Sequence, residues 1–76
     1  MSEKLPRVTA DKVIKALKHL GFHLVRQSGS HKIYRNELNT RVTIPYHSGK
    51  ILHPKVLKSI LKDANIGIEE FKKLLK

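Results

Sequence analysis

A histidine directly follows a glycine-containing turn near the middle of the chain, in the run 29–34 (GSHKIY). An imidazole exchanges protons near neutral pH, so His31 could serve as a general base or a general acid. A tight turn on one side and a strand on the other would hold its backbone in a defined position. His31 is therefore the candidate catalytic residue, and the alternative is a surface histidine on a solvated β-hairpin.

Cationic side chains lie close to this histidine in the sequence and would attract a phosphate backbone. This combination suits RNA cleavage by internal transfer, in which a base removes the 2′-hydroxyl proton and the oxygen attacks the adjacent phosphorus. Positive charge stabilises the transition state, and the route needs no metal or other cofactor. We expect RNA to contact the turn and four nearby cations. The RNA-binding candidates are Arg26, Gly29, Ser30, Lys32, Arg35 and Lys50.

The other four histidines have weaker claims to a role. His47 lies in a later loop and could supply the proton that the leaving 5′-oxygen needs. Nothing in the sequence places it near His31, so a loop histidine that contacts a partner, or has no role, is the alternative. We expect surface or capping roles for the rest, His19, His23 and His53. Without cysteine or a histidine cluster on one face, no metal site is expected.

The chain has 76 residues, which suffices for one domain. We expect a flexible leader at residues 1–8 and the folded domain at 9–76. Sixteen Lys and Arg against six Asp and Glu give a formal net charge of +10, which attracts nucleic acid, a membrane surface or an acidic protein. No signal-type apolar region begins the chain, and no apolar run approaches the roughly 20 residues that span a bilayer. We expect a cytoplasmic protein without membrane contact.

An amphipathic helix is predicted ahead of the histidine motif. Thr9 is the predicted N-cap, and Gly21 stands where a left-handed residue commonly ends a helix. Between them, the apolar residues recur at helical spacing on one face. These residues are Val13, Ile14, Leu17 and Leu20.

The pattern then changes to that of short strands. Residues 22–27, 31–35 and 41–44 are predicted strands, because they are rich in β-prone residues and bounded by polar segments. Residues 28–30 form the first turn and residues 36–40 a polar loop. The expected result is a three-stranded antiparallel meander that carries His31 at the start of its middle strand.

Two further helices follow the strands. Pro54 suits the first helical position, with His53 before it, and Asn65 can cap the helix end. Apolar residues at helical spacing predict a short last helix over 68–75. The sequence thus predicts an α+β fold, α-β-β-β-α with an extra C-terminal helix, in which both main helices cover one face of the sheet.

Four stretches of the chain together resemble the HicA-type mRNA interferase toxins of bacterial type II toxin–antitoxin systems. The first closes the first helix and the second surrounds the histidine. The third covers the last strand and its loop, and the fourth is the second helix. These stretches are LGF at 20–22, LVRQSGSHKIY at 24–34, VTIPYHSG at 42–49 and LKSILKDANI at 57–66. Two departures are Lys32, where many members have a second histidine, and the second helix start at 53–56, where many have Gly-Thr.

The resemblance implies a fold similar to a double-stranded-RNA-binding domain. It also implies ribosome-independent cleavage of mRNA, growth arrest, and neutralisation by a HicB-type antitoxin. The family's catalytic histidine corresponds to His31.

Two other functions fit the composition. One is a non-catalytic RNA-binding module that recognises A-form backbone by shape and charge, and it would have no need of an imidazole on a tight turn. The other is an interaction protein whose basic surface docks an acidic partner. A DNA-binding helix-turn-helix is disfavoured because the last helix is short, acidic at its start and apolar.

Overall fold

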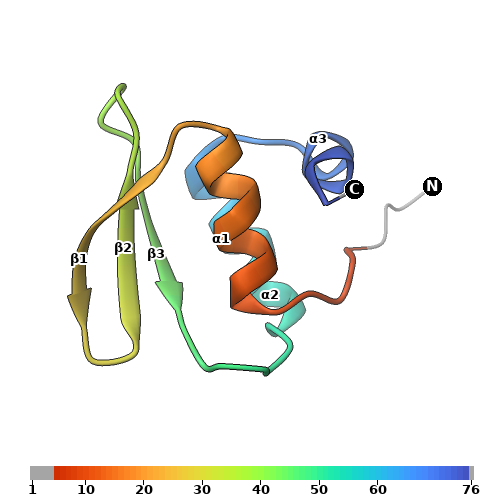
Figure 1. Ribbon diagram of the computed structural model, residues 1–76. Helices are drawn as coiled ribbons and strands as arrows, with labels where there is room; N and C mark the ends of the chain where they lie inside the picture. Colours follow the sequence, from red (N-terminus) through yellow and green to blue (C-terminus); the bar gives the residue numbers. More distant parts are fainter. Residues whose placement is uncertain (1–4, 76) are drawn as a thin grey trace.

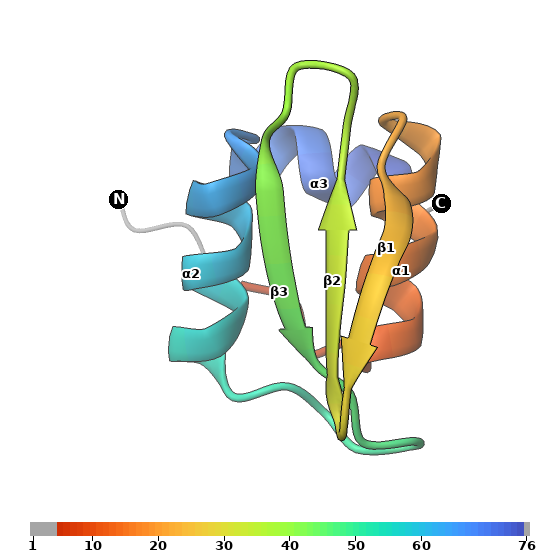
Figure 2. The ribbon, with the colours of Figure 1, turned by 90° about the vertical axis from the view of Figure 1, so that its left-hand side faces the viewer.

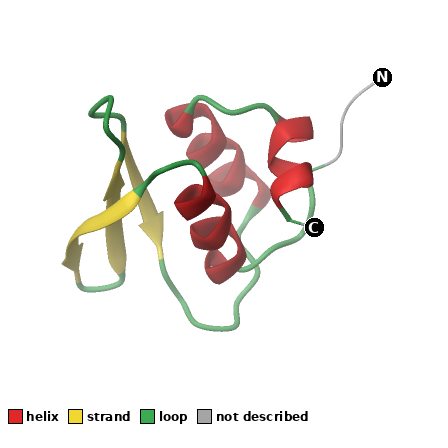
Figure 3. Ribbon diagram, turned by 45° about the horizontal axis from the view of Figure 1, so that its top comes forward, coloured by secondary structure: helices red, strands yellow, loops and turns green. Residues whose placement is uncertain are grey.

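Residues 5–75 are described by a computed structural model with three helices and three strands. The strands form one antiparallel sheet in the order β1-β2-β3, and α1 and α2 lie on one face of it (Figures 1 and 3). Helix α3 lies on the side of these helices away from the sheet (Figure 1). The elements are α1 (Ala10–His19), β1 (His23–Ser28), β2 (His31–Arg35), β3 (Arg41–Pro45), α2 (Pro54–Ala64) and α3 (Ile68–Leu74). The predicted α+β fold is confirmed, and it is consistent with a double-stranded-RNA-binding-domain-like arrangement.

Helix α1 begins and ends at the predicted signals. The Thr9 Oγ1 accepts a hydrogen bond from the Lys12 backbone N–H at 3.4 Å, which satisfies one free donor of the first turn. After the helix, Gly21 has φ +90°, a conformation that favours glycine. Val13 and Leu17 are fully buried on the inner side of the helix.

Helix α2 is capped at both ends by the residues that flank it. The His53 Nδ1 accepts a hydrogen bond from the Lys55 N–H at 3.1 Å, and Pro54 occupies the first turn, where its missing N–H costs nothing. Asn65 ends the helix in the left-handed region, with φ 60°. These positions agree with the sequence prediction.

The core lies between the sheet and the helices. Its fully buried residues include Leu17 of α1, Ile44 of β3, Leu57 of α2 and Phe71 of α3, so every helix contributes to it. Among residues 5–75, no charged or polar residue is buried. Strand β1 begins and ends one residue later than predicted, at His23 and Ser28, and Phe22 just before it is buried in the core.

The segment before α1 runs beside the segment before α2. Thr9 and Ile51 form an antiparallel bridge, and the Leu52 N–H donates to the Val8 carbonyl at 2.8 Å. Val8 is only 7% exposed. Of the leader expected at 1–8, residues 1–4 lie outside the described residues, and its last residue packs into the core.

No helix within residues 5–75 combines the length and the apolar character that a membrane crossing needs.

We expect Phe71→Ala to lower the free energy of unfolding by about 3–5 kcal/mol, because it empties the only buried site of α3. Urea unfolding followed by circular dichroism measures the change. Leu38→Ala is the control, since Leu38 is 85% exposed and its loss should be nearly neutral. Equal stability of the two variants would show that α3 does not support the core.

Candidate active site

The histidine motif sits on a two-residue turn between β1 and β2. Ser28 and His31 are paired across the strands, which leaves Gly29 and Ser30 as the turn. Gly29 has φ +57°, whereas Ser30 is not among the residues with positive φ, a combination found in type II′ turns. The Gln27 side-chain amide donates to the Gly29 carbonyl at 3.2 Å. The turn therefore presents His31 as the exposed first residue of β2.

Strand pairing assigns the alternate residues of β2 to opposite faces of the sheet. Tyr34, 3% exposed, faces the helices together with its β3 partner Val42, so it packs in the core. His31, Ile33 and Arg35 consequently point to the face that no helix covers, here called the open face. Lys32 points to the helix side, away from His31.

Arg26 and Arg35 share the open face with His31. Arg26 is paired with Ile33, one pair along from the Ser28–His31 pair on that face. Arg35 lies at the far end of β2, four residues from His31, or about 13 Å along the strand. The structure therefore places these two candidates on one surface with His31, although not in one tight cluster.

Arg41 belongs to the same surface and was not among the sequence candidates. It is the β3 partner of Arg35, and His23 of β1 is the partner on the other side. The Arg35 Nε is buried and has no hydrogen-bond partner in the described part of the chain. Arg41 alternates with the buried Val42 and Ile44 along β3, but only the pairing register shows that it stands beside Arg35.

Lys32 is held on the other side of the sheet by an aromatic ring. Its Nζ lies 3.9 Å from the centroid of the Tyr46 ring, a cation–π contact. The Tyr46 hydroxyl donates to the Asp11 Oδ1 at 2.9 Å, and its backbone N–H donates to the Ser30 carbonyl at 2.6 Å. Tyr46 thus links the turn before His31 to the start of α1.

The hydrogen bond to Asp11 also raises the pKa of the Tyr46 phenol, since it stabilises the protonated form. Burial raises the pKa of Tyr34. Both phenols therefore remain protonated at neutral pH, and neither is a candidate base.

The strand register brings His47 near His31, a proximity that the sequence did not indicate. His31 is paired with Pro45, and His47 is two residues further along. Opposite residues of antiparallel strands have Cα atoms about 5 Å apart, and two extended residues add at most about 7 Å, so the two histidine Cα atoms lie within roughly 13 Å. The turn and the connection after β3 also lie at the same end of the molecule (Figure 2).

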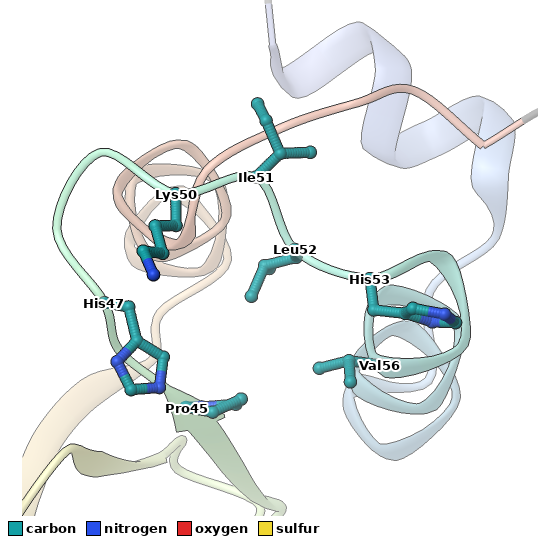
Figure 4. Close-up of a pocket in the computed structure, with 7 residues that line it drawn as sticks. All are labelled: Pro45, His47, Lys50, Ile51, Leu52, His53 and Val56. Atoms are coloured by element: carbon teal, nitrogen blue, oxygen red, sulfur yellow. The ribbon is translucent and has the colours of Figure 1, made fainter.

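A pocket of about 280 Å³ opens beyond Pro45, between the end of β3 and the start of α2. The side chains of Pro45, Leu52 and Val56 point into it, with His47 and Lys50 on one side (Figure 4). The His53 ring is turned away from this space, toward the helix end that it caps. Lys50 is therefore placed near His47 rather than on the open face.

Within residues 5–75, no three His, Asp or Glu side chains form a group that could hold a metal ion.

Comparison with known proteins identifies the family. The model of a family described as "HicA toxin of bacterial toxin-antitoxin" matches residues 10–66, which include the whole sheet, the turn and the pocket. No curated protein matches the chain significantly.

We expect Gly29→Ala to destabilise the hairpin by about 1 kcal/mol, because an L-residue is strained at φ +57° even though no atom lies within 4 Å of the added Cβ. Urea unfolding measures this loss. Ser30→Ala is the matched control in the same turn and should change stability less, since Ser30 needs no left-handed backbone. Equal effects of the two changes would contradict the assigned role of Gly29.

Proposed function

This chain belongs to the HicA toxin family of bacterial toxin–antitoxin systems, and from that premise we propose that it is an endoribonuclease that cleaves mRNA with His31 as catalytic base. The observation that carries the proposal is the position of His31. It is exposed at the end of a tight turn, on a face that also bears Arg26 and Arg35. A base for the 2′-hydroxyl and charges for the phosphate therefore share one accessible surface.

In the proposed reaction, the His31 imidazole takes the proton of a 2′-hydroxyl. The 2′-oxygen forms a bond to the adjacent phosphorus while the bond from phosphorus to the 5′-oxygen breaks. The products are a 2′,3′-cyclic phosphate and a 5′-hydroxyl, whose proton comes from an acid. His47 is the candidate acid because it lies within roughly 13 Å of His31 by Cα, a separation that two side chains and a bound phosphate can span.

We assign the arginines of the open face to the RNA backbone. Arg35 and Arg41 are paired neighbours, so their guanidinium groups offer several N–H donors to phosphate oxygens on one surface. Arg26 lies nearer to His31 on the same face. Gly29 and Ser30 form the turn directly before His31, and Lys50 lines the pocket beyond Pro45, so all three would contact RNA near the reacting phosphate.

Lys32 has a different part in this proposal. The Lys32 ammonium lies over the Tyr46 ring, so its charge is on the helix side of the sheet. It would contact RNA only where a bound RNA strand passes around the end of the sheet. Its main contribution is to fix Tyr46 and, through Tyr46, the turn that carries His31.

A toxin of this kind has an antitoxin partner, which we propose to be of the HicB type. The net charge of +10 favours an acidic partner surface, and covering the open face would block RNA and His31 together. Cleavage of mRNA places the proposed activity in the bacterial cytoplasm.

We expect His31→Ala to slow RNA cleavage at least about 100-fold, the scale of a lost general base. Purified proteins and a labelled single-stranded RNA give the rates. The wild-type rate should persist in EDTA. His19→Ala, at an exposed position on α1, is the control and should cleave normally.

Expression in a bacterial host tests the same proposal in cells. Wild type should arrest growth with loss of mRNA, and a folded His31→Ala variant should do neither. Unchanged arrest in the variant would assign toxicity to binding alone or the chemistry to another residue such as His47. No arrest by either protein would favour the non-catalytic RNA-binding module.

We expect Arg26→Gln and Arg35→Gln each to weaken RNA binding and to reduce the slope of log K against log salt by about 0.7, the value of one phosphate contact on a single strand. Titrations in the His31→Ala background avoid cleavage. Lys73→Gln removes the same charge from α3, on the far side of the helices, and should leave the slope unchanged. A slope that responds equally to all three changes would mean that the open face has no special role.

A further inference from the structure

We propose that the pocket beyond Pro45 receives one unpaired RNA base next to the scissile phosphate, and so sets the sequence at which this toxin cuts. The inference rests on the proposed ribonuclease function and assigns the pocket as its specificity site. Three features of the pocket support it: the apolar walls, the polar side, and the position relative to His31.

The walls of the pocket suit the flat face of a base. Pro45, Leu52 and Val56 point into the space (Figure 4), and the two aliphatic residues are also packed against the hydrophobic core. Packing against the core keeps these walls in place, so the pocket does not need to form around its ligand. Its volume of about 280 Å³ is near the lower end for ligand pockets and suits a single base rather than a larger group.

The opposite side of the pocket is polar and cationic. His47 and Lys50 lie there together (Figure 4). The imidazole can stack on a base or hydrogen-bond to its edge, as histidines do with unstacked RNA bases. A lysine ammonium only donates hydrogen bonds, so it favours a base edge that presents a carbonyl oxygen. Guanine, uracil and cytosine each have such an edge, whereas adenine has no carbonyl oxygen.

The position of the pocket connects the base to the chemistry. His31 and Pro45 are directly opposite each other in the sheet, so their Cβ atoms are about 5 Å apart on the same face. Pro45 is thus the wall between His31 and the pocket. A nucleotide whose base enters the pocket has its sugar and phosphate at the rim beside Pro45, within reach of the imidazole.

The test is to map cleavage sites in an RNA with a randomised segment. Wild type should prefer guanine, uracil or cytosine over adenine at one position beside the cut. Val56→Phe fills the pocket and should reduce that preference roughly tenfold or more, the scale of one lost base contact. Lys50→Gln should reduce the preference for a carbonyl edge. Leu38→Phe, in the exposed loop at the other end of the sheet, and Lys73→Gln are the matched controls and should retain it.

Retention of the wild-type preference by folded Val56→Phe would overturn the inference and leave the ribonuclease proposal intact. Cleavage by wild type without any preference beside the cut would do the same. If wild type does not cleave, the ribonuclease proposal fails. Binding of a 2′-deoxy oligonucleotide then shows whether the pocket receives a base. Saturable shifts of the Leu52 and Val56 methyl NMR signals, absent with an abasic oligonucleotide, would support a base site, and unshifted signals would exclude it.

Discussion

The register of β2 against its two neighbours is the constraint on which the rest of the structure depends. A sheet with one buried face tolerates no slip, because a shift by one residue exchanges the faces of every side chain. Tyr34, Val42 and Ile44 are all nearly inaccessible on the helix side, so their burial holds the register. The same register places His31 opposite Pro45. Core packing thereby also positions the candidate catalytic residue.

A bulge in β1 completes the open face. Leu24 is paired with Tyr34, but Arg26 rather than Val25 is paired with Ile33, so Val25 is an extra residue. If β1 had no bulge, Val25 would be paired with Ile33. Arg26 would then be paired with Lys32 and would face the helices. The inserted residue moves Arg26 to the surface that holds His31, as bulges beside functional sites commonly do. One extra residue in β1 thus places Arg26 on the same surface as Arg35 and His31.

Local signals in the sequence predicted most of the fold, because they act within a few residues. The Thr9 cap, the Asn65 end and the glycine turn before His31 all depend on neighbours in the chain. The features that were not predicted involve residues distant in sequence. The contact of Lys32 with Tyr46 depends on pairing between strands and on the course of the connection after β3. The pocket likewise needs that connection to meet α2, and no local pattern encodes the meeting.

Charge distribution links the fold to its proposed partners. The net charge is +10, yet within residues 5–75 the only ion pair is Lys72 with Glu69, 3.7 Å apart on the surface of α3. An exposed pair of this kind contributes little to stability, so ion pairs offset little of the repulsion among the other cations in this part of the chain. A polyanion that binds the folded chain would relieve this repulsion and stabilise the fold by mass action. In the proposed function, RNA and an acidic antitoxin both bind the arginines of the open face, so they would compete for the same relief. Inhibition would require no change in the fold of the toxin, only a partner whose acidic surface binds those arginines more tightly than RNA does.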